Sequence, residues 1–275
     1  MTNTTKIQKN GKEPVVVVEN VEKTYMVGGQ AVNILKGVSV TIYKGDFFII
    51  FGPSGCGKST LLHSILGLDK PTKGRVIFSD HDFNKMDEDE IAAFRKTKVG
   101  LVFQASYWIK SLTVIENVAF PLFLMGKLPS EAAKIATEKL TLMGMESWSS
   151  YSPAELSSGQ QQKVGLARAL VVDPDVIVAD EPTGNLDSKS GEELMELLVR
   201  LNKEQGKTIL MVTHDLEYMK YANRVVHIMD GVIVEEFDGD VKSKIKKYMI
   251  SKRGAAVAKG VAEESDADYL KKTIQ

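Results

Sequence analysis

A glycine-rich segment, "GPSGCGKST" at residues 52–60, is the part of the sequence with the clearest chemical meaning. It follows the apolar run "FFIIF" and fits the pattern G-x-x-x-x-G-K-S/T of a phosphate-binding loop. Glycines let backbone N–H groups turn inward around phosphate oxygens at the start of a helix, where the helix dipole also favours anions. The expected contacts are Gly52, Pro53, Ser54, Gly55, Cys56, Gly57, Lys58, Ser59 and Thr60. A chance glycine loop is disfavoured because a strand precedes the segment and a helix follows it.

Two residues of this loop have the side chains that nucleotide chemistry needs. Lys58 is expected to reach the β- and γ-phosphates, and the Ser59 hydroxyl is expected to ligate Mg²⁺. Cys56 is the one cysteine of the chain. We interpret it as a tolerated small residue in preference to a redox switch.

A carboxylate that serves the Mg²⁺ ion is expected at the end of another buried strand. The segment "DVIVADE" at residues 175–181 supplies it. Asp180 follows four apolar residues, as a carboxylate that serves the Mg²⁺ ion would. Glu181 is placed to orient and deprotonate an attacking water, with a capping or surface role as the alternative. His214 ends the run "TILMVTH" at the edge where ligands gather in parallel sheets. A lone histidine is usually structural, but at this position it is a credible contact to the γ-phosphate.

A second segment, "LSSGQQQKVGLARAL" at residues 156–170, also has the pattern of a helix whose N-terminus binds an anion. It lies about a hundred residues after the phosphate loop. The alternative is an ordinary capped helix with Val164, Ala167 and Val171 on its apolar face. That alternative does not explain why Gly159 follows two serines.

Strands and helices alternate along most of the chain. A helix is expected from Lys58 to about Gly67, and capping pairs mark two further helix starts, at Asp87 with Glu90 and at Thr113 with Glu116. The region from about 105 to 165 is predicted to be mostly helical. In a later helix, a single core-facing stripe that ends before Gly206 is expected from Leu194, Leu197, Leu198 and Leu201. The alternation predicts a parallel, three-layer α/β core into which the helical block is inserted.

Composition narrows the class of protein. The 275 residues carry a formal net charge of −1, which provides no basic field for nucleic acid, so we expect no nucleic-acid partner. The sequence contains no apolar run of the roughly 18–20 residues that span a bilayer, and its N-terminus lacks an apolar signal core. A single cysteine fits a reducing compartment. We therefore expect a soluble cytosolic protein.

The phosphate loop, "LSSGQ", "VIVADEP" and the strand-terminal histidine, in this order, resemble the nucleotide-binding subunits of ABC transporters. The likeness runs from about Val15 to about Glu236. It implies a P-loop NTPase parallel-sheet core with an antiparallel β subdomain and an inserted α-helical subdomain. In this interpretation residues 1–13 are a flexible N-terminus, 14–236 the ATP-binding domain with a helical subdomain at about 105–165, and 237–275 a helical or disordered C-terminal extension.

The resemblance also implies roles for individual residues. Tyr25 in "VEKTY" matches the aromatic residue that stacks on adenine. Gln104 in "VFQ" matches the glutamine that senses Mg²⁺ and the membrane subunit. Asp187 in "NLD" matches the loop that crosses between paired subunits.

The family pairs two copies head to tail, so that each ATP lies between the phosphate loop of one copy and "LSSGQ" of the other. This arrangement implies that Ser157, Ser158, Gly159 and Gln160 contact the nucleotide of the partner, chiefly through the Ser157 hydroxyl and the Gly159 N–H. It implies ATP and Mg²⁺ as cofactors, and ATP hydrolysis as the reaction. It also implies an integral membrane permease subunit as a separate partner, which would place this chain on the cytoplasmic face of the membrane.

The segments "DEPTGNLDS" and "ENVAFPL" resemble those of the group that contains the lipoprotein-releasing, macrolide-efflux (MacB-like) and cell-division (FtsE-type) ATPases. Members of this group work with FtsX-like or MacB-like membrane partners and are thought to relay mechanical work across the membrane. Regulation of a cell-wall enzyme remains an alternative, as does an import ATPase, which "GNLD" disfavours. A soluble ABC protein of translation or DNA repair is disfavoured by the single cassette and the absence of heptads.

The sequence departs from the family pattern at three positions of the second segment. Ser158 stands where glycine is usual, Lys163 where arginine is common and Gly165 where alanine is common. If Ser158 must adopt left-handed backbone, the cost is about 1–2 kcal/mol. Gly165 inside a helix costs about 1 kcal/mol relative to alanine.

Two further segments have open interpretations. Tyr107 and Trp108 belong either to the core of the helical lobe or to a surface for the membrane subunit. In the tail, "IKKYMI" is expected either to form a short helix with Ile245, Tyr248 and Met249 on one side, beside anionic lipid, or to be disordered.

Overall fold

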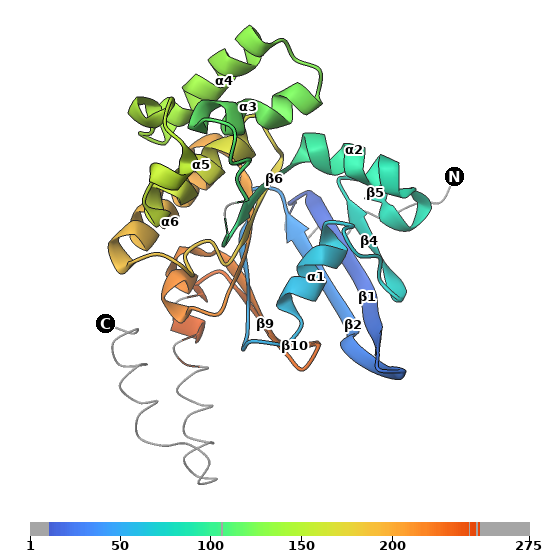
Figure 1. The fold of residues 1–275 in the computed structure, drawn as a ribbon. Coiled ribbons are helices and arrows are strands. Elements are labelled where there is room, and N and C mark those ends of the chain that lie inside the picture. The colour runs from blue at the N-terminus through green and yellow to red at the C-terminus, as the bar shows by residue number, and fades with distance from the viewer. Residues whose placement is uncertain (1–10, 106, 242, 246, 248–275) are drawn as a thin grey trace.

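A computed structural model describes residues 11–105, 107–241, 243–245 and 247, and in this part of the chain two β-sheets form. The larger sheet has the strand order β10-β9-β3-β8-β7-β6, of which β6, β9 and β10 are labelled in Figure 1. All its neighbouring strands are parallel except β10, which pairs antiparallel with β9. These strands are β3 (Phe47–Phe51), β6 (Val99–Phe103), β7 (Val176–Asp180), β8 (Thr208–Thr213), β9 (Arg224–Met229) and β10 (Val232–Asp238).

The parallel strands are apolar on both faces because both faces are covered. Successive side chains of a strand point to opposite sides of the sheet. In β3, Phe47, Ile49 and Phe51 therefore join one hydrophobic core, and Phe48 and Ile50 join the other. The sheet thus separates two cores, each closed by its own layer.

The two layers are made of different elements. One core contains apolar residues of α3 (Val114–Leu124), α4 (Pro129–Leu142), α5 (Ser158–Leu170) and α6 (Ser188–Gln205). The other contains residues of α1 (Lys58–Ile65), α2 (Glu88–Lys98) and the second sheet. Short 3₁₀ helices complete the described fold at η1 (Phe83–Lys85), η2 (Glu146–Trp148), η3 (Pro153–Glu155) and η4 (Leu216–Tyr221).

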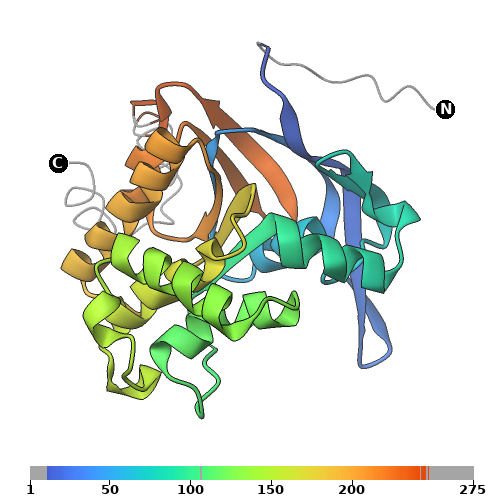
Figure 2. The same cartoon turned by 90° about the horizontal axis from the view of Figure 1, so that it is seen from above.

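The second sheet is antiparallel, with the order β2-β1-β4-β5. Its strands are β1 (Pro14–Val27), β2 (Gln30–Tyr43), β4 (Lys73–Phe78) and β5 (His81–Asp82). The long β1–β2 hairpin projects from one side of the molecule, and α3 and α4 form a lobe on another side (Figures 1 and 2). The parallel core, antiparallel sheet and helical lobe are those expected from the sequence.

The predicted capping pairs are confirmed. Asp87 and Glu90 form a capping box at the start of α2, and Thr113 and Glu116 form another at the start of α3. Gly206 ends α6 in left-handed backbone, with φ 65°.

The predicted apolar stripe of α6 needs one adjustment. Leu194, Leu198 and Leu201 are buried as expected. Met195 is fully buried beside them, whereas Leu197 is only partly buried. The helix turns about 100° per residue, so residues i and i+1 can both lie within a wide buried face.

The described part of the C-terminal extension packs on the core. Val241 and Ile245 are buried and join the cluster that contains α5 and α6. Tyr248 and Met249, expected on the same side of a short helix, lie outside the described residues. Among the residues that the structure describes, no helix combines the length and the apolar character that crossing a bilayer requires.

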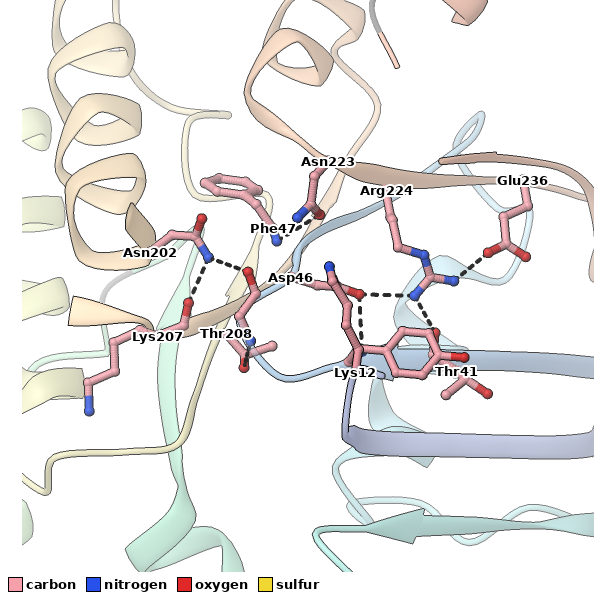
Figure 3. A network of polar contacts seen from close by, with 12 residues as sticks. Lys12, Thr41, Asp46, Phe47, Asn202, Lys207, Thr208, Asn223, Arg224 and Glu236 are labelled. Atoms are coloured by element: carbon pink, nitrogen blue, oxygen red, sulfur yellow. Dashed lines mark hydrogen bonds and ion pairs between the residues drawn. The ribbon is translucent and has the colours of Figure 1, made fainter. Parts of the chain in front are cut away.

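A buried carboxylate joins the two sheets. Asp46, which is fully buried, accepts hydrogen bonds from Lys12 Nζ at 2.9 Å, the Tyr43 N–H at 3.0 Å and Arg224 Nη1 at 3.0 Å (Figure 3). Arg224 also pairs with Glu236 on β10. The network ties the end of β2 to the starts of β3 and β9, at the amino ends of the parallel strands.

Candidate nucleotide-binding site

The residues predicted to do chemistry follow the carboxyl ends of four neighbouring parallel strands. Gly52 follows β3, Gln104 follows β6, Asp180 ends β7 and His214 follows β8. The register pairs Phe51 with Thr213, Asp180 with Val212 and Phe103 with Asp180. Parallel strands place their carboxyl ends on one edge of the sheet, which is where ligands bind in such folds. The topology therefore gathers residues that are more than 160 positions apart in sequence.

The phosphate loop has the backbone that its glycines were expected to allow. A Cβ at Gly52 would lie 2.2 Å from the carbonyl oxygen of Ile228, so any larger residue would displace the neighbouring strand. Gly57 has φ 105°, a left-handed conformation, and is the N-cap of α1. It has no side chain to cap the helix, so the first N–H groups of α1 are available to a phosphate.

Lys58 is buried and lies across the loop. Its Nζ donates hydrogen bonds to the carbonyl oxygens of Gly52 at 2.8 Å and Pro53 at 2.9 Å. Ser59, whose hydroxyl is the expected metal ligand, is exposed, as are Pro53, Ser54 and Gly55. Thr60 is half-buried. Cys56 is buried, and burial raises the pKa of its thiol, which supports its interpretation as a packing residue.

Two acidic residues, Asp180 at the end of β7 and Glu181 directly after it, lie at the sheet edge. Burial raises the pKa of Asp180, and the charge of Glu181 adds to this. The charges of His63 and Lys58 act in the opposite direction. A cation at this point would stabilise the ionised form of Asp180, which fits the role predicted for it.

Glu181 has unusual backbone for a residue with a side chain. Its φ is 45°, a conformation that is uncommon outside glycine. Two backbone hydrogen bonds hold it: its N–H donates to Val212 at 2.9 Å, and its carbonyl accepts from Gly184 at 3.1 Å. Its Oε1 lies 3.2 Å from Nδ1 of the exposed His214. The strain of about 1–3 kcal/mol expected for such backbone is typical of residues at functional sites.

Gln104 is held by Asn185 and Gln162, which lie in quoted segments but whose contacts with Gln104 the sequence did not predict. The Gln104 Nε2 donates a hydrogen bond to Asn185 Oδ1 at 3.4 Å. The buried Gln162 of α5 donates through Nε2 to the carbonyl oxygens of Phe103 at 3.0 Å and Gln104 at 2.8 Å. No periodic or motif signal points to these contacts, because each joins segments at least 58 residues apart.

The segment "LSSGQ" starts α5, as predicted. Ser157 is the N-cap: its Oγ accepts from the Gln160 N–H at 3.3 Å, and Gln160 Oε1 accepts from the Ser157 N–H at 2.9 Å. Ser158 is the first helical residue and is not among the described residues with positive φ. The left-handed strain considered for Ser158 is therefore absent. Ser157 and Ser158 are exposed, and Gly159 follows at the same helix start.

Two predicted contacts have clear roles within this chain. Asp187 is the N-cap of α6: it accepts from the Ser190 N–H at 2.9 Å and from the Ser190 hydroxyl at 2.8 Å, and the backbone bond lowers its pKa. Tyr25 lies on β1, and its hydroxyl donates to Asp69 at 2.5 Å. Burial is the main cause of the raised pKa of Tyr25, and the Thr60 side chain of α1 acts in the opposite direction, so the hydroxyl lies near the start of α1.

The two helix starts belong to opposite layers. Leu61 and Leu62 of α1 lie in one core, and Val164 and Leu166 of α5 lie in the other. The sheet therefore separates the helix that follows the phosphate loop from the helix that follows "LSSGQ" (Figure 1).

Comparison with known proteins identifies the family. Residues 35–184, more than half of the chain, match the family described as "ABC transporter". The chain belongs to the ABC transporter family. It is an ATP-binding subunit of the ABC type, and it binds and hydrolyses ATP.

Three relatives illustrate the breadth of the match. The solved ATP-binding cassette MJ0796 of Methanocaldococcus jannaschii, described as a dimer in a post-hydrolysis state bound to ADP and Pi, aligns with a TM-score of 0.76 and 42% identity. That alignment covers 81% of this chain and 98% of the other. The lipoprotein-releasing system ATP-binding protein LolD of Idiomarina loihiensis is 38% identical, over 79% of this chain and 96% of LolD.

The third relative is larger. The macrolide export ATP-binding/permease protein MacB of Chlorobium phaeobacteroides is 44% identical over 81% of this chain, but this chain spans only 34% of it. The ABC cassette fold and the family predicted from the sequence are confirmed by these matches.

Proposed function

We propose that this ABC subunit acts as an ATP-driven head-to-tail dimer that works on a separate integral membrane protein of the FtsX-like or MacB-like type. The observation that carries the proposal is the separation of the two anion-binding helix starts by the central sheet. We infer that one chain does not bring both of them to one phosphate. A second copy, turned head to tail, supplies the missing helix start, and MJ0796 is described as dimeric.

The chemistry of Ser157 suits this arrangement. Its oxygen already accepts a hydrogen bond from Gln160, so its hydroxyl proton is left to donate to a phosphate oxygen of the nucleotide on the partner. The uncapped N–H groups at the start of α5, including that of Gly159, add donors at the positive end of the helix dipole. Asp187 lies at the start of α6 as a further contact across the dimer.

Mg²⁺ is proposed as the second cofactor. The Ser59 hydroxyl and the Asp180 carboxylate lie on the same sheet edge, and Gln104 is the third residue expected near the ion. Within the described residues, no group of three or more His, Cys, Asp or Glu side chains is placed to hold a metal. A cation here would therefore take most of its ligands from nucleotide phosphates and water, as Mg²⁺ commonly does.

Glu181 is proposed to orient the attacking water and accept its proton. Its strained backbone and its contact with His214 aim the carboxylate at the edge where the γ-phosphate would lie. His214 is proposed to contact the γ-phosphate, and Lys58 to bind the β- and γ-phosphates. Tyr25 is proposed to stack on the adenine ring.

A groove on the helical side of the molecule is the proposed seat of the membrane partner. It has a volume of about 470 Å³ and lies between α2, β6, α3 and α5. Leu124 is 60% exposed and Tyr107 71% exposed at its wall. Trp108, in contrast, packs against the core and donates to Gln161 at 2.9 Å. The sequence did not decide whether Tyr107 and Trp108 belong to the core or to a docking surface. In the structure Trp108 packs against the core and Tyr107 lines the groove.

The groove is suited to an apolar segment that also carries acidic groups. Its lining is mostly apolar, and Arg95, Lys96 and Arg168 add positive charge. A cytoplasmic helix of a membrane protein has this chemistry, which would place the subunit on the cytoplasmic face of the membrane. The similarity to LolD and to the ATP-binding part of MacB supports mechanical transmission or export as the work done.

The test is the variant Glu181→Gln, which keeps the shape of the side chain and removes the base. We expect ATP hydrolysis to fall by about 10²-fold or more and the protein to run as a dimer by light scattering in Mg-ATP. Glu196→Gln, on the exposed face of α6, is the matched control and should keep the activity of the unmodified chain. A Glu181→Gln protein that binds Mg-ATP but stays monomeric, with and without the membrane partner, would refute the dimer.

A further inference from the structure

The aromatic residue on β1 is held by two other side chains. The Tyr25 hydroxyl donates to Asp69 Oδ2 at 2.5 Å. Lys23, two residues earlier on the strand, donates through Nζ to Asp69 Oδ1 and to the carbonyl oxygen of Lys70, the latter at 2.7 Å. We refer to Lys23, Tyr25 and Asp69 as the tyrosine clamp.

Among the lysines of the described chain, only Lys23 and Lys58 are buried, at 9% and 6% exposed. A buried ammonium is retained where a counter-charge and hydrogen bonds compensate its lost hydration. The Lys23 Nζ also lies 5.0 Å from the centroid of the Tyr25 ring, within the range of a cation–π contact. The tyrosine is therefore held at its hydroxyl by Asp69 and on its ring by Lys23.

The clamp connects two parts of the nucleotide site. Asp69 lies four residues beyond the end of α1, whose first residue is Lys58 of the phosphate loop. The backbone adjoining the clamp is joined as well: the Thr72 N–H donates to the Glu22 carbonyl at 2.8 Å, and the Thr24 N–H donates to Thr72 Oγ1 at 3.0 Å. The strand that carries Tyr25 is thus tied to the segment that follows the phosphate-binding helix.

The protonation states fix the direction of the hydrogen bonds. Burial acts to raise the pKa of Asp69, but the hydrogen bonds from Lys23 and Tyr25 outweigh it and lower the pKa below the usual value. Burial, followed by the hydrogen bond to Asp69, raises the pKa of Tyr25. At neutral pH, Asp69 is therefore an ionised acceptor and Tyr25 a protonated donor.

We infer that Asp69, itself held by Lys23, is a positioning residue that keeps the Tyr25 ring in the orientation that stacks on the base of ATP. The inference rests on the proposed contact of Tyr25 with adenine. A released ring would distribute over three staggered χ1 wells. If one well stacks, the competent fraction falls to about one third, and the apparent Kd for ATP rises about threefold.

The experiment measures the Kd for ATP and for inorganic tripolyphosphate by displacement of a fluorescent ATP analogue. Tyr25→Phe removes the hydroxyl and keeps the ring, and Asp69→Ala removes the acceptor. We expect each variant to weaken ATP about threefold and to leave tripolyphosphate, which has no base, unchanged. The double variant should be no weaker than either single variant, because both break one interaction. In steady-state assays KM should rise while kcat stays the same.

The matched control is Glu22→Gln on the same strand as Tyr25, which breaks the ion pair of Glu22 with Lys73 of β4 and leaves the contacts of Tyr25 in place. It should leave both Kd values unchanged. Tyr25→Phe keeps Lys23 paired with Asp69, so the inference stays testable if Asp69→Ala destabilises the fold.

Three results would overturn the inference: an unchanged Kd for ATP in Tyr25→Phe, an equal loss of tripolyphosphate binding, or a double variant whose effect is the product of the two single effects. Tyr25→Ala separates this failure from failure of the base contact. If Tyr25→Ala leaves ATP binding unchanged, the proposed contact with adenine is wrong. If it weakens ATP binding while Tyr25→Phe does not, the contact stands and the clamp has no role in it.

Discussion

Replacing Asp46 with alanine tests whether the buried ion network holds the two sheets together (Figure 3). The change removes an acceptor of three hydrogen bonds and leaves the positive charge of Arg224, whose side chain is 5% exposed, without one of its two carboxylates. Breaking a buried ion pair by removing one partner costs about 3–5 kcal/mol of unfolding free energy.

Details of the network place the cost of Asp46→Ala near the lower end of this range. The Lys12 side chain is 48% exposed and can return to water. Arg224 keeps its contact with Glu236 and its hydrogen bond to the Thr41 carbonyl at 2.6 Å. We therefore expect a loss of about 3 kcal/mol. For a chain of this size that corresponds to a fall in Tm of roughly 6–12 °C.

The assay is urea denaturation of the full chain followed by circular dichroism, without nucleotide. Glu236→Gln is the matched control, because it removes the other carboxylate that pairs with Arg224; the Glu236 side chain is 41% exposed. That variant should lose about 1 kcal/mol or less. A loss in Asp46→Ala no larger than in Glu236→Gln would refute the reasoning. ATPase activity of folded Asp46→Ala should persist, because Asp46 and Gly52 lie at opposite ends of β3.

Three further predictions follow from features described above. Ser158→Gly should leave ATPase activity within a few-fold of that of the unmodified chain, because Ser158 has ordinary helical backbone; a loss of activity would give the serine a specific role. Leu124→Glu should reduce co-purification of the membrane partner and leave the ATPase activity of the isolated subunit unchanged, since Leu124 is on the proposed docking groove and away from the nucleotide edge; unchanged co-purification would move the docking site elsewhere. The hydrogen bond from Lys207 lowers the pKa of Asp173 in the folded protein. The stability that this contact gives the fold is therefore present above the pKa of about 3.9 that Asp173 has in the unfolded chain. It is lost as pH falls through the lower pKa of Asp173 in the folded protein. Lys207→Met should therefore lower the unfolding free energy more at pH 7 than near pH 2, where only the hydrogen bond of Lys207 to the Pro174 carbonyl at 2.9 Å is lost, and an equal loss at both values would contradict this.

Local chemistry made much of the fold predictable. Capping boxes at Asp87 and Thr113 depend on residues three positions apart, so the sequence displays them directly. The strand ends could be predicted because short apolar runs finish at polar residues such as Asp180. Parallel topology then collects those ends on one edge without further information.

The rest depends on contacts that no local pattern encodes. The hydrogen bond of Tyr25 to Asp69 spans 44 residues, and that of Gln162 to Gln104 spans 58. Such pairs exist only after the strands have been placed in register. The backbone of Ser158 was left open by the sequence, which gave a cost only if the residue were left-handed. The capping of α5 by Ser157 makes Ser158 an ordinary first helical residue.

The opposite placement of α1 and α5 across the sheet also determines which ATP site of the proposed dimer is impaired by a defect in one chain. A defect at Lys58 impairs the site of the chain that carries it, whereas a defect at Ser157 impairs the site of its neighbour. If one copy carries the first defect and its partner carries the second, both defects fall in the same site and the other site is whole. If a single chain carries both, each site in its pairing with an intact copy has one defect. Complementation between defective copies thus depends on how the defects are distributed between the chains, as well as on how many there are.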